Sequence, residues 1–196
     1  MIRKSSTSNI SRRAFFIRKL RRWFNKHGRD YPWRRTKNPY RILISEYLLQ
    51  QTNADLALPT YQQFIKDYPT AKSLAEADIR KLRRLIALIG LSYRADRLKI
   101  IGRQLVSDFA GKIPQSRDDL LKLHGVGLYM SNAVLCFAFE ERVPILDTNT
   151  IRIFERVFGI VSDLKRPRTD KKLENRMKAY LPNRKIREFN YGLLSS

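Results

Sequence analysis

The stretch Leu123-His124-Gly125-Val126-Gly127 decides how this 196-residue sequence is interpreted. Apolar residues recur at helical spacing over residues 117–123 and 128–139, so the stretch is predicted to link two helices. Two glycines one residue apart permit a tight turn and a close approach of the backbone to another molecule. The N–H groups of the turn adjoin the positive end of the second helix, which suits an anion. On these five residues alone, an ordinary tight turn is an equally good interpretation.

Helical periodicity also fills most of the remaining chain. One helix carries Phe16, Leu20, Trp23 and Phe24 and ends at Gly28; others are predicted over residues 40–51, 54–68, 79–89, 94–109, 148–158, 170–180 and 185–193. No segment alternates apolar and polar residues as a half-buried strand does. Residues 1–13 are rich in Arg, Lys, Ser and Asn and read as a flexible basic arm. The sequence therefore predicts an all-α fold.

The charge of the chain points to a polyanionic partner. Lys and Arg number 40 against 18 Asp and Glu, which gives a formal net charge of +22. The basic residues alternate with aromatic and apolar ones, which favours nucleic acid over both a generally basic solvated surface and a membrane surface. No apolar run reaches the roughly 18–20 residues that span a bilayer, and no secretory signal is evident. We expect no membrane partner.

Further motifs carry a resemblance to a known family. The hairpin together with Tyr129, and the segment PILDTN at residues 144–149, resemble the helix–hairpin–helix and aspartate-bearing loop of the base-excision DNA glycosylases. The segments GRDYPWR (28–34) and PYRILISEYLLQQT (39–52) are more similar to the thymine/uracil mismatch and adenine branches than to endonuclease III. The resemblance implies two lobes with the active cleft between them: a six-helix barrel at residues 35–141, and a lobe of residues 14–34 and 142–196.

The resemblance assigns a role to each of two carboxylates. Breaking an N-glycosidic bond leaves positive charge on the sugar and negative charge on the departing base. Asp147 is expected to stabilise the sugar and position the attacking water, and Glu46 to supply the acid near the base. From pattern alone, Asp147 suits a helix N-cap and Glu46 a helix glutamate paired with an arginine. Trp33 and Arg34 could support the Glu46 helix or contact the DNA backbone.

Tyr129 is expected to decide the type of reaction. Bifunctional relatives have a lysine at this point, whose amine forms a Schiff base with the sugar and nicks the strand. A phenol cannot form that imine. The resemblance therefore implies a monofunctional hydrolase that leaves an abasic site.

Other residues are expected to contact DNA. Gln50 and Gln51 would enter the base stack, with Gln51 in the space vacated by the flipped nucleotide, and Leu91 would be a wedge opposite. The hairpin would hold a phosphate; its expected contacts are His124, Gly125, Val126 and Gly127. His124 departs from the family pattern, which usually has proline there.

Two absences complete the expectations. Cys136 is the single cysteine, so neither the iron–sulfur cluster of many relatives nor any metal or organic cofactor is expected. A C-terminal domain that adenine glycosylases use to read 8-oxoguanine is also missing, which favours thymine or uracil opposite guanine as the target. Adenine opposite guanine or 8-oxoguanine, and a non-catalytic mismatch-binding module, are the alternatives. The expected partner is mismatched double-stranded DNA, bound by a monomer in a prokaryotic cytoplasm, with organelle targeting left open.

Overall fold

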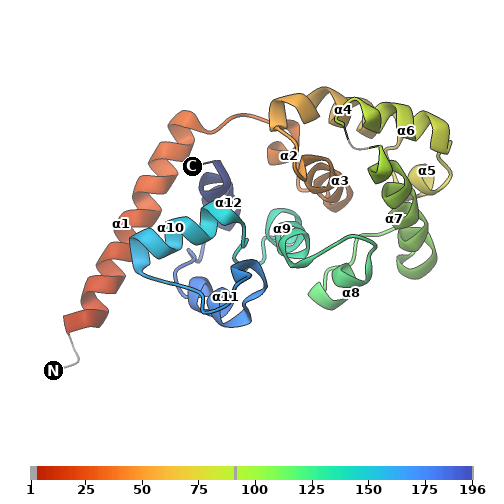
Figure 1. Cartoon of the computed structure of the whole chain (residues 1–196). Helices are drawn as coiled ribbons and strands as arrows, with labels where there is room; N and C mark the ends of the chain where they lie inside the picture. Colours follow the sequence, from red (N-terminus) through yellow and green to blue (C-terminus); the bar gives the residue numbers. More distant parts are fainter. Residues whose placement is uncertain (1–3, 91, 196) are drawn as a thin grey trace. The chain divides into compact units, whose positions relative to one another are not determined.

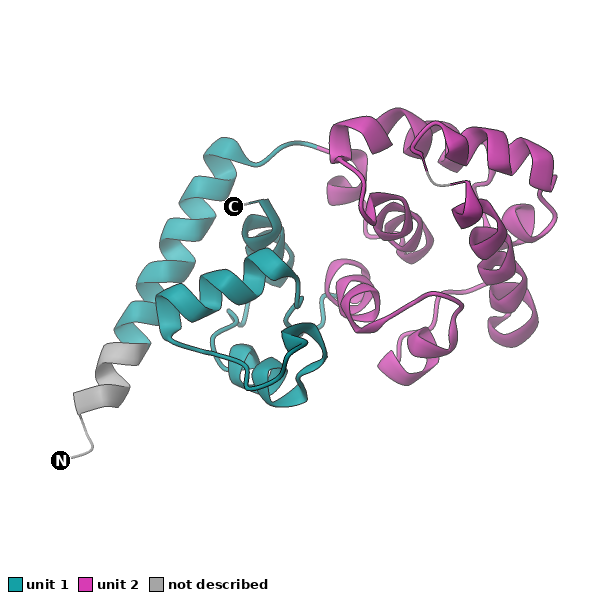
Figure 2. Ribbon diagram, in the orientation of Figure 1, with its two compact units in different colours: residues 1–30, 140–196 teal, residues 31–139 magenta. Residues whose placement is uncertain are grey.

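The computed structural model describes residues 4–90 and 92–195, and within these ranges its regular structure is helical throughout. The predicted all-α fold is thereby confirmed. The chain divides into a terminal unit, residues 1–30 and 140–196, and a middle unit, residues 31–139 (Figure 2). The middle unit starts before the predicted residue 35 because Trp33 is buried against Tyr61, with ring centroids 5.1 Å apart. In addition, the Tyr31 hydroxyl donates a hydrogen bond of 2.7 Å to Asp55.

The middle unit is built around one almost wholly enclosed helix. Its helices are α2 (Pro32–Arg35), α3 (Pro39–Leu49), α4 (Ala54–Asp67), α5 (Ala71–Ala75), α6 (Ile79–Ala87), α7 (Tyr93–Phe109), α8 (Arg117–Lys122) and α9 (Leu128–Phe139) (Figure 1). Helix α3 is buried from Ile42 to Leu48, and it packs against α9, which is buried from Met130 to Phe137. Helices that are apolar on all sides belong inside a core rather than at its surface. The α3–α9 pair is therefore the centre of this unit.

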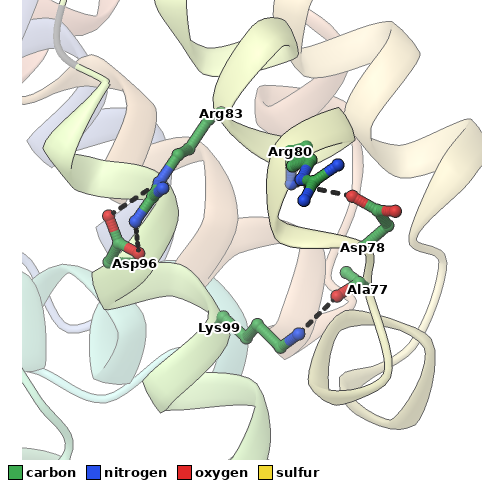
Figure 3. Close-up of polar contacts among 6 residues, drawn as sticks. All are labelled: Ala77, Asp78, Arg80, Arg83, Asp96 and Lys99. Atoms are coloured by element: carbon green, nitrogen blue, oxygen red, sulfur yellow. Dashed lines mark hydrogen bonds and ion pairs between the residues drawn. The ribbon is translucent and has the colours of Figure 1, made fainter.

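Three polar contacts lie at helix α6 and the residues before it (Figure 3). The Asp78 carboxylate caps α6 by accepting the N–H of Arg80 at 2.7 Å. Arg83 on α6 forms a two-pronged ion pair with Asp96 on α7, at 2.7 and 3.2 Å. Lys99 on α7 donates to the carbonyl of Ala77 at 2.5 Å. Pairs as exposed as these contribute little stability, so the burial of Leu82 and Ile86 does most to hold α6 in place.

The terminal unit packs its helices around a cluster of aromatic rings. It contains α1 (Lys4–His27), α10 (Thr148–Phe158), the 3₁₀ helix η1 (Pro167–Thr169), α11 (Lys171–Lys178) and α12 (Ile186–Ser195). Phe16 of α1 lies edge-on to Phe158 and Phe189, with ring centroids 5.2 and 6.1 Å apart. Helix α1 also packs along α12, where Leu20 meets Gly192.

The predicted flexible arm covers residues 1–13, whereas helix α1 already begins at Lys4. Arg13 explains part of this difference. Its guanidinium donates to the carbonyls of Tyr180 at 3.2 Å and Leu181 at 2.6 Å, both in the segment after α11. Composition alone could not reveal these contacts, because the acceptors lie more than 160 positions away in the sequence. Among the described helices, none has both the length and the apolarity needed to cross a lipid bilayer.

Gly102 on α7 allows this helix to lie directly on α5, so its replacement tests the packing. A Cβ at this position would be 2.8 Å from the backbone nitrogen of Ala75 and 2.9 Å from Cγ of Leu74. Alanine normally stabilises a helix interior by about 1 kcal/mol relative to glycine. Gly102→Ala should instead lower the free energy of unfolding by about 1–3 kcal/mol through overpacking, measured by urea unfolding. The exposed Ser107→Ala on the same helix is the control; a gain in stability from Gly102→Ala would contradict the packing.

Candidate functional site

Glu46 places a carboxyl group inside the core of the middle unit. It lies on α3 among Leu43, Tyr47 and their buried neighbours, and only 4% of its surface is exposed. Burial raises the pKa of the Glu46 carboxyl from 4.5 to about 7, although a hydrogen bond with Tyr129 and the positive charge of Arg34 act in the opposite direction. An acid with this pKa can hold or release a proton near neutral pH, as a general acid must.

The structure brings Glu46 and Tyr129 together. Tyr129 is the second residue of α9, and the packing of α9 against α3 presents its hydroxyl to the carboxyl group. Arg34 of α2 is near enough for its charge to act on the same carboxyl. This charge agrees with a supporting role for Arg34 beside Glu46, and the alternative contact with the DNA backbone stays a prediction. Trp33 belongs to the core and stacks on Tyr31, with ring centroids 4.7 Å apart.

The hairpin, residues 123–127 between α8 and α9, is held by two side chains from other helices. The hydroxyl of Tyr47, the residue after Glu46, donates to the carbonyl of His124 at 3.3 Å. Gln104 of α7 accepts the N–H of His124 at 2.7 Å and donates to the carbonyl of Lys122 at 3.3 Å. The hairpin and the buried carboxyl are therefore tied to adjacent residues of one helix.

The structure requires glycine at only one of the two glycine positions of the hairpin. Gly125 has a φ of +73°, and a Cβ there would lie 2.4 Å from the Tyr47 hydroxyl oxygen, so this position requires glycine. A Cβ at Gly127 would meet no atom within 4 Å, which leaves its outer side open. The Val126 side chain is buried and its N–H bonds to the carbonyl of Leu123 at 3.1 Å. His124, Gly125 and Gly127 are exposed, as DNA contacts would be.

Gln50 and Gln51 form a turn directly after α3, which ends at Leu49 instead of continuing to the predicted Gln51. Gln51 has a left-handed φ of +54°, which no continuing helix allows, and its side chain is exposed. The carbonyl of Gln50 is bonded by a buried arginine, Arg94 of α7. The predicted wedge, Leu91, lies outside the described residues.

Asp147 belongs to the terminal unit, where it caps α10. Its carboxylate accepts the N–H of Thr150 at 2.7 Å, and it is partly exposed at the end of a buried segment, residues 143–146. The neighbouring side chains are engaged by arginines: Arg168 donates to Thr148, and Arg152 donates to Asn149 at 2.8 Å. The N-cap interpretation is correct, and it leaves the second carboxylate oxygen available for another contact.

The described residues offer neither an accessible thiol nor a cluster of metal-binding side chains. Cys136 is fully buried within α9. Across residues 4–90 and 92–195 no group of three or more His, Cys, Asp or Glu side chains could hold a metal ion.

Sequence reasoning missed Gln104 and Arg94 as supports of the site. In the sequence both look like ordinary polar residues of α7. No local motif predicts that a side chain bonds to a loop some twenty or forty residues away. For Arg94 the sequence does offer one indication of burial: it falls on the same helical face as the buried Leu98 and Ile101. An arginine on an apolar face is one whose partners must be found inside the fold.

Comparison with known proteins places these features in a wider context. The family model "HhH-GPD superfamily base excision DNA repair protein" matches residues 44–182. The chain is 38% identical over 181 residues to the thymine-DNA glycosylase of Aeropyrum pernix, covering 90% of this chain and 81% of that protein. It is 37% identical over 177 residues to the thymine/uracil-DNA glycosylase of Pyrobaculum aerophilum, covering 88% and 77%. An adenine DNA glycosylase of Buchnera aphidicola is 32% identical, and the match spans 49% of its length.

Solved structures agree with this comparison. The structure of a thermostable thymine-DNA glycosylase matches with a TM-score of 0.88 and 34% identity, covering 96% of this chain and 87% of that one. A non-covalent endonuclease III–DNA complex matches with a TM-score of 0.75 at 21% identity, a likeness of fold.

Replacing the two hairpin glycines separately tests the support from Tyr47. Gly125→Ala should lower the free energy of unfolding by about 1–3 kcal/mol, because the left-handed backbone and the Tyr47 hydroxyl both oppose a Cβ. Gly127→Ala should change it by less than about 0.5 kcal/mol. Adding Tyr47→Phe to Gly125→Ala removes the clashing oxygen, so the double variant should recover part of the loss. Equal stabilities of the two single variants in urea unfolding would contradict this account.

The buried carboxyl of Glu46 should make stability fall with rising pH. Its pKa is about 7 in the folded chain against 4.5 for the exposed group, so the folded state binds more protons between these values. The free energy of unfolding should therefore decrease as pH rises from 4.5 to 7, by roughly 3 kcal/mol at most. Glu46→Gln removes this dependence and should be more stable than the wild type at pH 8. Urea unfolding at pH 5 and pH 8 measures this dependence, with the exposed Glu76→Gln variant as control. An equal change in the free energy of unfolding between the two pH values for Glu46→Gln and the wild type would contradict the prediction.

Proposed function

This chain belongs to the HhH-GPD superfamily of base-excision DNA repair proteins and is a DNA glycosylase, and we propose that it excises thymine or uracil mispaired with guanine in duplex DNA. The names of its thymine- and uracil-directed relatives, whose lengths it largely spans, support this target. It spans only about half of the adenine glycosylases that it also matches. We further propose that it acts as a monomer.

The observation that carries the proposal is the buried Glu46 carboxyl with its raised pKa and its Tyr129 partner. A base leaves more easily when the charge that develops on it is met by a proton or a hydrogen-bond donor. In the proposed mechanism Glu46 supplies that proton in its neutral form. Tyr129 and Arg34 limit the rise of its pKa, so both forms are populated near neutral pH and the group can be recycled.

Asp147 supplies the complementary charge in this mechanism. Its carboxylate faces the deoxyribose as the base departs, stabilises the oxocarbenium-like sugar and positions the attacking water. The bond from Thr150 N–H fixes the orientation of the carboxylate, which supports such a role. Electrostatic stabilisation of this kind depends on groups held in place before charge develops.

Tyr129, the second residue of α9, sets the outcome of the reaction in this mechanism. Tyr129 has no amine, so no Schiff base with the sugar forms through it and water is the nucleophile. The product is an abasic site in an unbroken strand. The exposed hairpin backbone at Gly125 and Gly127 contacts a phosphate of the bound DNA.

Adenine excision is the second candidate, because adenine DNA glycosylases match 88% of this chain at 32–33% identity. A module that binds mismatches without catalysis is the third. The two carboxylates, Glu46 and Asp147, argue against this non-catalytic module, because binding DNA does not require a buried carboxyl with a raised pKa.

A panel of duplexes with single G·T, G·U, A·G and A·8-oxoG pairs tests the target. We expect abasic product from G·T and G·U, and no covalent adduct when borohydride is added to trap a Schiff base. Abasic product from the A·G and A·8-oxoG duplexes alone would identify adenine as the target base. A trapped adduct would refute the monofunctional mechanism. Binding of all duplexes with no product from any would favour the non-catalytic module.

Asp147→Asn is the matched variant for this panel. Asparagine caps a helix about as well as aspartate, so the fold should be kept while the negative charge is lost. Excision should fall by about 10²-fold or more with DNA affinity largely retained, a loss typical of removing one transition-state stabiliser. Turnover at the wild-type rate would remove Asp147 from the mechanism.

A further inference from the structure

Arg94 on α7 is a fully buried arginine that has no part in the proposed chemistry. Only 1% of its surface is exposed, and the partners of its guanidinium belong to residues 48–52. One terminal nitrogen donates to the carbonyl of Leu48 at 3.0 Å and to the hydroxyl of Thr52 at 3.2 Å. The other donates to the carbonyl of Gln50. Its Nε is buried and has no partner among the described residues.

Burying an arginine lowers the stability of the fold unless its hydrogen bonds compensate. Removing a guanidinium from water carries a large desolvation penalty, which these bonds must offset. Two of its three acceptors, the carbonyl oxygens of Leu48 and Gln50, are ones that a helix end leaves without intrahelical partners, since α3 stops at Leu49. Arg94 therefore caps the C-terminus of α3 from a neighbouring helix. A planar group with several fixed donors suits three divergent acceptors better than a lysine ammonium does.

The capped segment is the one that presents Gln51. The Thr52 N–H bonds to the carbonyl of Leu49 at 3.2 Å, and the Thr52 hydroxyl bonds to the carbonyl of Gln50 at 3.2 Å. These bonds and the Arg94 contacts close a turn in which Gln51 has a left-handed backbone and an exposed side chain. A glutamine held in this sparsely populated conformation persists only where its surroundings enforce it. Arg94 is a buried group that bonds to the residues on both sides of Gln51.

We propose that Arg94 is a positioning residue that acts through Gln51. By fixing the turn at residues 50–52, it holds the Gln51 side chain ready to enter the base stack as the target nucleotide leaves. It thereby promotes extrusion of the base without touching the reacting atoms. This inference rests on the proposed function, in which Gln51 fills the vacated space. Its consequence is that Arg94 matters most where the target base must be pulled from a paired stack.

The experiment compares two substrates in single-turnover excision with the full chain. One is a duplex with a G·U pair; in the other, the same uracil lies in a short bubble of unpaired bases flanked by duplex. Arg94→Lys should lower the rate on the paired substrate by about tenfold or more, while the bubble rate stays within about threefold. The exposed Arg103→Lys on the same helix is the matched control and should change neither rate. Equal losses on both substrates would mean a merely structural role and overturn the proposal.

A double variant tests whether Arg94 works through Gln51. If it does, Arg94→Lys combined with Gln51→Ala should lose no more on the paired substrate than the more damaging single variant. Independent, multiplying losses would overturn the inference while leaving the role of Gln51 intact. If Gln51→Ala alone left both rates unchanged, the insertion role would fail and the inference with it. Absence of excision from every wild-type reaction would instead refute the proposed function.

Thr52→Val covers the case in which Arg94→Lys does not fold. This variant keeps the arginine and removes only the hydroxyl that it contacts, at nearly constant side-chain volume. It should show the same preferential loss on the paired substrate, with a smaller amplitude. 2-Aminopurine next to the mismatch gives a second readout, because its fluorescence rises when the stack opens. Wild-type opening and wild-type rates in Thr52→Val would then overturn the proposal.

Discussion

The packing of α9 against α3 is the constraint on which the centre of the middle unit depends. It brings Tyr129 to the carboxyl of Glu46, an ionisable group whose surroundings are otherwise apolar. A core optimised for stability alone would have a neutral residue at position 46. The proposed function gives this carboxyl a use, at the expense of stability above neutral pH.

Helix α3 serves the site at several successive points along its length. Glu46 meets Tyr129, Tyr47 supports the hairpin, and the turn at residues 50–52 begins just beyond its end. From Glu46 to Gln50 the helix rises only about 6 Å. The Glu46 carboxyl, the support of the hairpin and the start of the turn therefore share one rigid element, and a shift of α3 along its axis would displace them together. The enclosure of α3 by its neighbours restrains such a shift.

Much of the fold followed from local sequence rules, and the failures share a physical cause. The predicted ranges for α9 and α10 agree with the structure, and side-chain chemistry correctly predicted that Asp147 suits a helix N-cap. The short helix α5 was missed because five residues carry too little periodicity to register. Three features were missed because they depend on partners distant in sequence: the end of α3, the contacts of Arg13 in α1 and the bonds from Gln104. The pKa of Glu46 likewise reflects burial that only the folded chain creates.

The lone cysteine has a practical consequence. Cys136 lies wholly inside α9, on the helix that also presents Tyr129, and the sequence contains no other thiol. A thiol reagent can reach it only when the packing of the middle unit opens, so the rate of alkylation measures how often that opening occurs. The native chain thus carries a built-in chemical reporter of breathing in its core, readable without any engineered label.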